Sequence, residues 1–144
     1  MRVPAIIAMI LSVTACTTQT QLETTRVQIA GVSVVAEIAD DNMERAIGLM
    51  NHTSLEENAG MLFVWSDEKT RSFWMKNTLI PLDIIFIDEN KTIADITTMQ
   101  PCKSLFCDSY RSKAPARYVL EVNAGFAEKH DVKIGDKVKI DNSR

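Results

Sequence analysis

The chain has little of what several protein classes require. Its 144 residues include only five glycines and four prolines, which excludes a collagen and a Pro/Gly-rich disordered polymer. Lysine and arginine number 16 against 19 acids, so the formal charge is -3 and a basic footprint for a phosphate backbone is missing. No apolar run reaches the length of a transmembrane helix, which excludes a multi-span transporter. We therefore expect no nucleic-acid partner.

Familiar catalytic signatures are also missing. The sequence has no G-x-S-x-G elbow, no glycine-rich phosphate loop and no H-E-x-x-H motif. Its two histidines, His52 and His130, are far apart and outside any ligand-spaced motif, so we expect no metal site and no cofactor. What is present, 46% hydrophobic and 24% charged residues, suits one globular domain.

The first sixteen residues have the order of an export signal. Arg2 precedes an eleven-residue apolar run from Val3 to Val13, which would cover roughly 16 Å as a helix, about half of a hydrocarbon core. The following Thr14-Ala15-Cys16 completes a small-residue cleavage site that resembles a bacterial lipobox. We predict a signal peptide over residues 1–15 and a lipid anchor on Cys16. A plain secretory signal with a coincidental cysteine is the alternative.

This signal also predicts the location and organisation of the mature chain. Residues 16–25 are rich in Thr and Gln and are expected to form a flexible tether, followed by one globular domain over residues 26–144. The protein is then held to a membrane of the cell envelope, outside the cytoplasm. In an organism with two membranes, Thr17 after the lipid cysteine favours the periplasmic face of the outer membrane.

Alternating apolar residues predict a β-rich fold. A hairpin is expected over residues 27–38 around Ala30-Gly31, with further strands at 60–65, 72–76, 84–87, 92–97, 117–123 and 138–140. The run Ile84 to Ile87 does not alternate, which predicts a central strand covered on both faces. The charged stretch 67–69 is expected to separate two of the strands.

Two short helices complete the prediction. Asp41-x-x-Glu44 predicts a capping box, followed by a helix that ends near Met50, with Met43, Ile47 and Met50 facing the core and Glu44 and Arg45 facing away. A second helix is expected over residues 124–130. The predicted fold class is α+β, with a single compact domain whose mostly antiparallel sheet curls toward a barrel.

Five separated segments carry a resemblance to a known family. They are Gly48-Leu49-Met50, Gly60 to Trp65, Ser72 to Thr78, Ile80 to Ile87 and Tyr118 to Gly125. In this order they resemble the family called domain of unknown function 192, over about Arg26 to Ile140. The resemblance implies a small β-rich single domain, often secreted or lipid-anchored, in bacteria and archaea. It implies no reaction.

A candidate ligand cleft lies around the third of these segments. Trp74 and Lys76 share one side of a predicted strand, and Asn77 and Asp83 follow around a proline turn. An aromatic face with a few polar groups suits a sugar or a peptide fragment. The structural alternative places Trp74 in the core and uses the polar side chains to hold the turn. Asp83 should be partly buried, with Lys76 or Arg71 as its partner.

Glu121 is the second candidate acid. It shares a face with Arg117, and a surface ion pair between them is the favoured interpretation, although Glu121 could instead point inward beside the ligand cleft. If Asp83 and Glu121 converged, the pair would support hydrolysis by general acid and base catalysis. The first choice is a non-catalytic module that binds a small molecule, a glycan or a protein. An envelope hydrolase and a structural or assembly factor are the alternatives.

The two remaining cysteines are expected to form a disulfide. Cys102 and Cys107 have four residues between them, and in an exported protein such a pair most simply closes one small loop. A redox pair or a metal site is the functional alternative. The bond would pin residues 101–110.

Overall fold

The computed structural model describes residues 22–141, so the predicted signal peptide, Cys16 and most of the predicted tether lie outside the described residues. Nine strands and two helices occur within this range. Their bounds are β1 (Thr24–Ile29), β2 (Val32–Ala39), α1 (Asn42–Ile47), β3 (Ala59–Lys69), β4 (Ser72–Trp74), β5 (Leu82–Ile87), β6 (Ile93–Met99), β7 (Ser109–Arg111), β8 (Ala116–Asn123), α2 (Phe126–Lys129) and β9 (Val138–Ile140). Neither helix of residues 22–141 has the length and hydrophobicity needed to cross a membrane.

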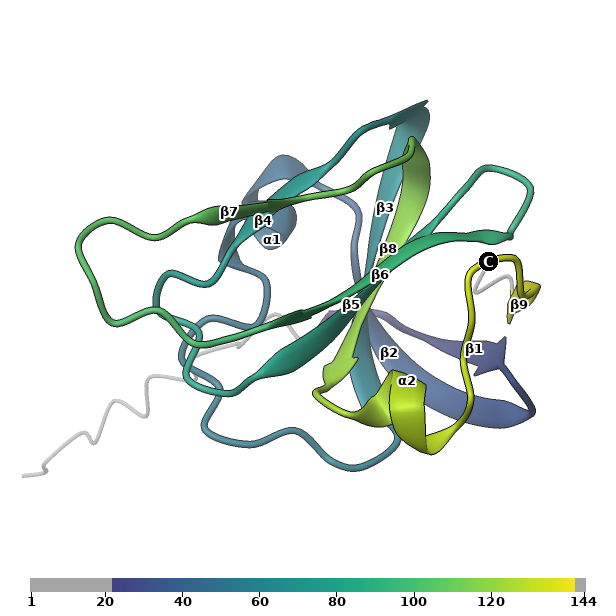
Figure 1. Ribbon diagram of the computed structural model, residues 1–144, viewed down its shortest axis with the longest axis horizontal. Coiled ribbons are helices and arrows are strands. Elements are labelled where there is room, and N and C mark those ends of the chain that lie inside the picture. The colour runs from purple at the N-terminus through teal and green to yellow at the C-terminus, as the bar shows by residue number, and fades with distance from the viewer. Residues whose placement is uncertain (1–21, 142–144) are drawn as a thin grey trace, which may run out of the picture.

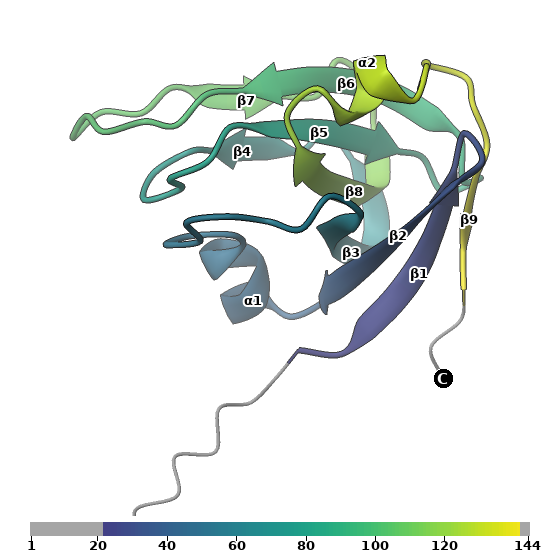
Figure 2. The same ribbon diagram turned by 90° about the horizontal axis from the view of Figure 1, so that it is seen from below.

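Seven strands form one curled sheet. Their order is β6-β5-β8-β3-β2-β1-β9, and every neighbouring pair is antiparallel except β2 and β3, which the α1 segment connects in parallel. The sheet bends back on itself into a half-barrel (Figures 1 and 2). An isolated bridge between Thr92 and Lys137 links its two ends. The β-rich fold class and the curled sheet are confirmed.

The first hairpin forms where the sequence predicts it. Ala30 and Gly31 both have positive φ, 47° and 78°, the two-residue turn whose twist matches that of paired strands. β1 begins at Thr24, two residues before the predicted start of the domain. The reason is that Thr25 is buried and its hydroxyl donates to the carbonyl of Asp141 at 2.7 Å.

Strand β5 is covered on both faces, as its lack of alternation predicts. All six of its residues are buried. Ile85 and Ile87 face one core, which we call the α2 core because Phe126 of α2 belongs to it. Leu82, Ile84 and Phe86 face a second core. We call it the α1 core because Leu49, just after α1, packs in it; its other buried members are Ala39, Met61, Phe63, Met75, Met99, Ala116 and Val119.

Helix α1 has the predicted capping box but not the predicted buried face. The backbone N–H of Glu44 donates to Asp41 at 2.8 Å, and the Glu44 carboxylate accepts from the backbone of Asp41. The helix ends at Ile47 rather than Met50, and Met43 is 69% exposed. Arg45 turns inward instead and donates to the carbonyl of Val64 at 2.8 Å. Six residues make fewer than two turns, so tertiary contacts and not periodicity decide which side faces the protein.

Of the two strands of the small second sheet, only β4 was predicted. β3 continues through the charged stretch to Lys69, so residues 67–69 do not end it. β4 then pairs with β7, a three-residue strand whose sequence shows no alternation and was not predicted. This pair packs beside the main sheet, and Phe73 of β4 contacts the α1 core. The β4–β7 pair therefore covers part of the sheet face that carries the α1 core.

Candidate functional site

The side chain of Glu121 points into the α1 core. In β8 it lies opposite Met61 of β3 and Ile84 of β5, and its strand neighbour on the same face is the buried Val119. Only 5% of Glu121 is exposed. The predicted surface ion pair is therefore wrong, and the guanidinium of Arg117 instead donates to the carbonyl of Trp65 at 3.2 Å.

The carboxyl group of Glu121 forms no hydrogen bond or ion pair with any other group of residues 22–141, and desolvation is the one cause of its pKa shift. A buried carboxylate without a partner is costly, so the group keeps its proton. Burial accordingly raises the pKa of Glu121 from 4.5 to about 8. At neutral pH this side chain is an uncharged carboxylic acid that can both donate and accept a hydrogen bond.

Glu121 lines a small cavity between α1, β3, β4 and β8, which we call the Glu121 pocket. Its volume is about 30 Å³, enough for one or two water molecules. Four segments of the chain supply its lining: Arg45, Ala46, Ile47, Gly48, Leu49, Met50, Phe63, Phe73, Trp74, Thr78 and Glu121. Thr78 is also buried, and its hydroxyl has no hydrogen-bond partner among the described residues. Two polar groups without partners therefore line one cavity.

The loop after α1 closes against the sheet through a glycine. Gly48 has φ of 49°, a conformation that favours glycine, and a Cβ at this position would lie 3.2 Å from the ring of Phe63. The backbone N–H of Asn51 donates to the carbonyl of Asn77 at 2.8 Å, which ties this loop to the turn after β4. These contacts bring the first and third of the family-like segments together at the pocket.

Aromatic rings form one wall of the pocket. The rings of Phe63 and Phe73 meet edge to face with centroids 5.0 Å apart, a favourable geometry for such a pair. Trp74 lines the pocket and is still 49% exposed, so it is not a core residue. The ammonium of Lys76 lies 5.4 Å from the centroid of the Trp74 ring. The wall thus continues outward as an exposed aromatic surface.

The structure brings together some of the predicted ligand-binding residues and separates others. Trp74 and Glu121 line one pocket. Lys76 is exposed beside Trp74 without lining the pocket, and Asn77 is exposed in the turn with φ of 58°. The lining residues that sequence reasoning did not single out include Gly48, Met50, Phe63 and Thr78. Their signal was present, since all of them lie in the segments that carry the family resemblance.

Asp83 does not belong to this site. It lies next to Ile84 in β5 and so faces the α2 core, on the opposite side of the sheet from Glu121. The Thr98 hydroxyl donates to it at 2.7 Å and the backbone N–H of Ala127 at 2.9 Å. The predicted partners were wrong, because neither Lys76 nor Arg71 contacts it; Arg71 pairs with Asp67 at 2.8 Å. Asp83 therefore joins α2 to the sheet.

This placement removes the geometric basis of the paired-carboxylate hydrolase. General acid and base catalysis of that kind needs two carboxyl groups flanking one bond of the substrate. Asp83 and Glu121 face opposite sides of the same sheet and line no common cleft. The convergence on which the hydrolase alternative depends is therefore not present among the described residues.

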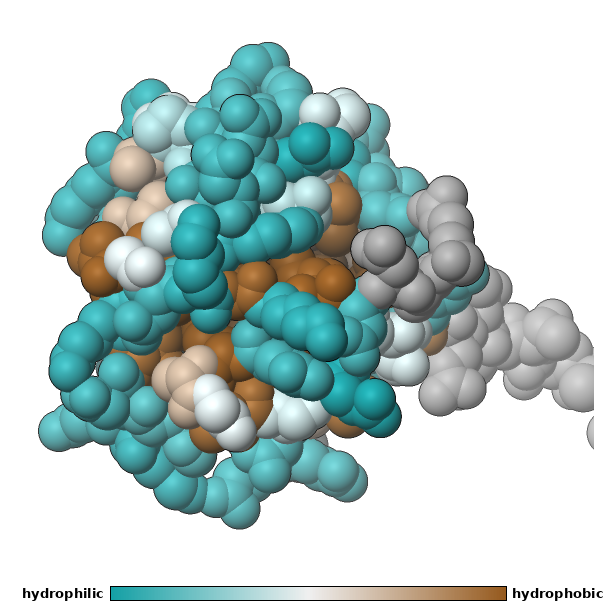
Figure 3. Space-filling view, turned by 90° about the vertical axis from the view of Figure 1, so that its right-hand side faces the viewer, coloured by the Kyte–Doolittle hydropathy of each residue, from teal (hydrophilic) through white to brown (hydrophobic). Residues whose placement is uncertain are grey.

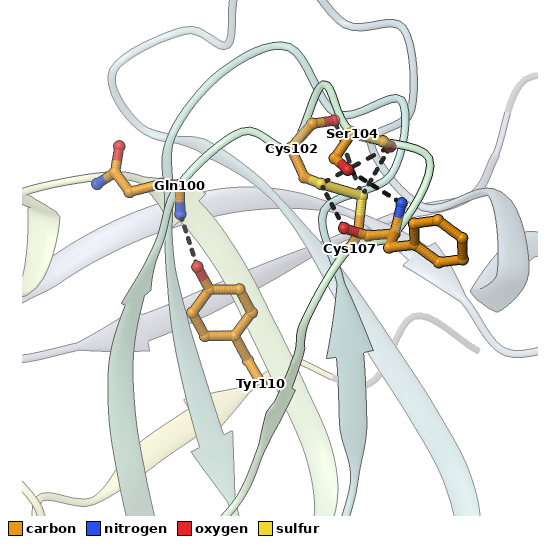
Figure 4. The surroundings of a disulfide bond; sticks show 6 residues. Gln100, Cys102, Ser104, Cys107 and Tyr110 are labelled. Carbon is orange, nitrogen blue, oxygen red and sulfur yellow. Dashed lines mark hydrogen bonds between the residues drawn. A yellow bond between two sulfur atoms is a disulfide. The ribbon is translucent and has the colours of Figure 1, made fainter.

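The disulfide between Cys102 and Cys107 is confirmed, with a Cα–Cα distance of 5.8 Å (Figure 4). It closes a loop between β6 and β7 in which the backbone N–H of Phe106 donates to the Ser104 hydroxyl at 3.1 Å. Tyr110 returns toward β6 and accepts from the backbone N–H of Gln100 at 3.3 Å. Within residues 22–141, no three His, Cys, Asp or Glu side chains gather in a group that could hold a metal ion.

A larger hollow of about 330 Å³ opens between β1, β2, β3 and β8. Leu62, Val64 and Tyr118 are apolar or aromatic members of its lining. Figure 3 shows hydrophobic residues gathered in the middle of the face on which β9 lies. The Lys91 ammonium already lies over the Tyr118 ring, 3.0 Å from its centroid. The buried polar residue of its lining, Thr25, already donates to the Asp141 carbonyl, whereas the Glu121 carboxyl has no partner among residues 22–141, so the Glu121 pocket is the stronger candidate site.

Comparison with known proteins gives consistent relatives. A UPF0127 protein of Pyrococcus abyssi is 32% identical over 108 residues, covering 72% of this chain and 83% of the relative. A UPF0127 protein of Pyrococcus horikoshii is 33% identical over 107 residues, covering 71% and 84%. Both names leave the activity open.

Two solved structures share the fold. A Sinorhizobium meliloti protein described as a proposed transcription regulator superposes with a TM-score of 0.77 at 32% identity, over 85% of this chain and 97% of that one. A protein of unknown function from Novosphingobium aromaticivorans gives 0.74 at 32% identity, over 85% and 89%. The sequence profile of the uncharacterised ACR family, domain of unknown function 192, matches residues 24–140. This chain therefore belongs to the domain of unknown function 192 family.

Proposed function

We propose that this chain is a non-catalytic binding module of the cell envelope, held to a membrane by a lipid on Cys16. The Glu121 pocket is its binding site, and Trp74 is the exposed part of that site. The partner is a small molecule, a glycan or a peptide segment that places one polar group in the pocket and an apolar part on Trp74. The export signal and the lipobox-like Val13-Thr14-Ala15-Cys16 support the location.

One observation carries the proposed site. Glu121 and Thr78 are buried residues that line one cavity, and neither the Glu121 carboxyl nor the Thr78 hydroxyl has a hydrogen-bond partner among residues 22–141. Folding gains nothing from leaving such groups unpaired. Functional sites are where proteins tolerate such a cost. Asp83 is the contrast, since its carboxylate is buried with both of its partners in place.

Binding is tested by thermal shift with purified envelope components. Muropeptides from digested peptidoglycan, free glycan chains and stem peptides are added to the mature chain, to Trp74→Ala and to Asp83→Asn. A bound ligand raises the melting temperature, since 100-fold excess over Kd stabilises the native state by about 3 kcal/mol. We expect a shift in the parent and in Asp83→Asn that is lost in Trp74→Ala. If no component shifts the parent, a structural or assembly role replaces the binding module.

The anchor has a separate test. Metabolic labelling with a palmitate analogue should label the parent chain, and Cys16→Ser should remove the label. The Cys102→Ser/Cys107→Ser double variant is the matched control, because it also loses cysteines and should keep the label. An unlabelled parent chain refutes the lipid anchor without affecting the pocket.

Transcription regulation, the role proposed for the Sinorhizobium meliloti protein, is not extended to this chain. Its formal charge of -3 offers no surplus of cations for a phosphate backbone.

A further inference from the structure

We infer that the Glu121 pocket recognises a carboxylate group carried on an apolar or aromatic body, with Glu121 in its protonated form as the hydrogen-bond donor. This inference rests on the proposed binding function and names the chemical class of its ligand. A free organic acid and the C-terminus of a peptide share this chemistry.

The charges around the pocket favour an anion over a cation. Among the lining residues, Arg45 is the permanent charge, and Glu121 is the one acid. The Arg45 guanidinium is held in place by the carbonyls of Asp40 and Val64 and by Asn42 Oδ1. Outside the lining, Lys76 lies over the Trp74 ring. Arg45 and Lys76 both repel a ligand ammonium and both attract a carboxylate.

The polar groups inside the pocket are those that a carboxylate needs. A carboxylate only accepts hydrogen bonds, and each of its oxygens has room for more than one donor. The protonated Glu121 and the Thr78 hydroxyl supply two donors without partners among residues 22–141. The cavity of about 30 Å³ admits a group of carboxylate size and leaves the rest of the ligand on the Trp74 ring. A bond from a neutral acid to a carboxylate is charge-assisted and therefore strong.

If the protonated Glu121 donates to the ligand, the affinity for a carboxylate must depend on pH. The elements packed around Glu121 carry other titratable or charged side chains: Asp41, Glu44 and Arg45 in and before α1, Asp67, Glu68 and Lys69 at the end of β3, and Arg117 in β8. Lys76 and His52 lie in the adjoining turns, and His52 Nδ1 lies 3.3 Å from the Met50 carbonyl oxygen. Carboxylate affinity should therefore be constant while Glu121 holds its proton and fall about tenfold per pH unit once it ionises.

The test uses three probes that carry one phenyl ring and differ in charge: benzoate, benzamide and benzylammonium. Binding to the mature chain is followed by NMR through the indole N–H of Trp74 and the methyl group of Thr78, at pH 6 and at pH 9.5. We expect benzoate to bind best at pH 6 and to weaken at least tenfold at pH 9.5. Ac-Gly-Gly-Phe with a free or an amidated C-terminus tests the peptide source in the same way.

Variants separate hydrogen bonding from folding. Glu121→Gln keeps a donor, so benzoate should still bind, now with equal affinity at both pH values. Glu121→Ala removes the donor and should abolish benzoate binding. Glu128→Gln, an exposed acid on α2, is the control and should behave like the parent.

The outcomes distinguish the ligand class from the binding function. Stronger binding of benzylammonium or benzamide at the same resonances overturns the carboxylate inference and leaves the pocket a binding site. Benzoate affinity that is equal at pH 6 and 9.5 in the parent overturns the role of the protonated Glu121. Failure of all three probes to shift either resonance overturns the inference, while the muropeptide screen decides the binding function independently.

Discussion

Replacing Glu121 with glutamine should change how the stability of the domain depends on pH. Burial raises the pKa of Glu121 from 4.5 to about 8. Between these values the native chain holds one proton that the unfolded chain releases, so this group makes the free energy of unfolding fall as pH rises. The slope is about 1.4 kcal/mol per pH unit. The contribution of protonated Glu121 to the free energy of unfolding is fully present below pH 4.5, and about 3 kcal/mol of this contribution is lost by pH 7. Glutamine does not titrate and removes this slope.

The assay is urea unfolding at pH 5, 6, 7 and 8, with Glu128→Gln as an exposed-acid control. The other titrating groups contribute equally to parent and variant, so the difference between their unfolding free energies isolates Glu121. The unfolding free energy of Glu121→Gln minus that of the parent should rise by about 3 to 4 kcal/mol from pH 5 to pH 8. The reasoning is refuted if that difference stays constant with pH, because Glu121 would then ionise equally in both states.

Three further substitutions test other parts of the account. Asp83→Asn weakens the bonds from Thr98 and Ala127, so its unfolding free energy should fall by about 2 kcal/mol in urea titrations; an unchanged value contradicts its role in holding α2. Gly48→Ala adds a Cβ near Phe63 at positive φ, whereas Gly125→Ala, also at positive φ (86°), places its Cβ in open space. Differential scanning calorimetry should therefore show a larger drop in Tm for Gly48→Ala. Equal drops would exclude a contribution from the Phe63 contact. The Cys102→Ser/Cys107→Ser double variant opens a loop with a sequence separation of 5, and it should lose about 2 kcal/mol while keeping the far-UV circular dichroism spectrum of a folded sheet.

Local features of the fold could be predicted because their causes lie close together in the sequence. The Ala30-Gly31 turn needs two residues at positive φ, the capping box needs Asp41 and Glu44, and the continuous apolar run of β5 indicates cover on both faces. The α1 face was mispredicted because a helix this short is positioned by tertiary contacts. Arg45 reaches Val64, a residue of β3 that no helical periodicity identifies.

The site itself depended on contacts between distant segments. Alternation in β8 places Glu121 and Arg117 on one face but does not say what covers that face. The cover comes from β4, whose partner β7 lies 35 or more residues further along the chain and had no sequence signal. Likewise, the partner of Asp83 is a backbone N–H of α2, and a backbone group leaves no trace in residue types. Residue pattern found the candidate acids, and topology decided which of them lies at a pocket.

The central claim, that Glu121 is a neutral acid poised to bind a carboxylate, is tested most directly by ¹³C NMR titration of its side-chain carboxyl carbon, with and without benzoate. The account predicts a midpoint near the pKa of about 8 for the free chain and a higher midpoint with benzoate bound. A midpoint near the ordinary value of 4.5, or one that benzoate lowers, would contradict it.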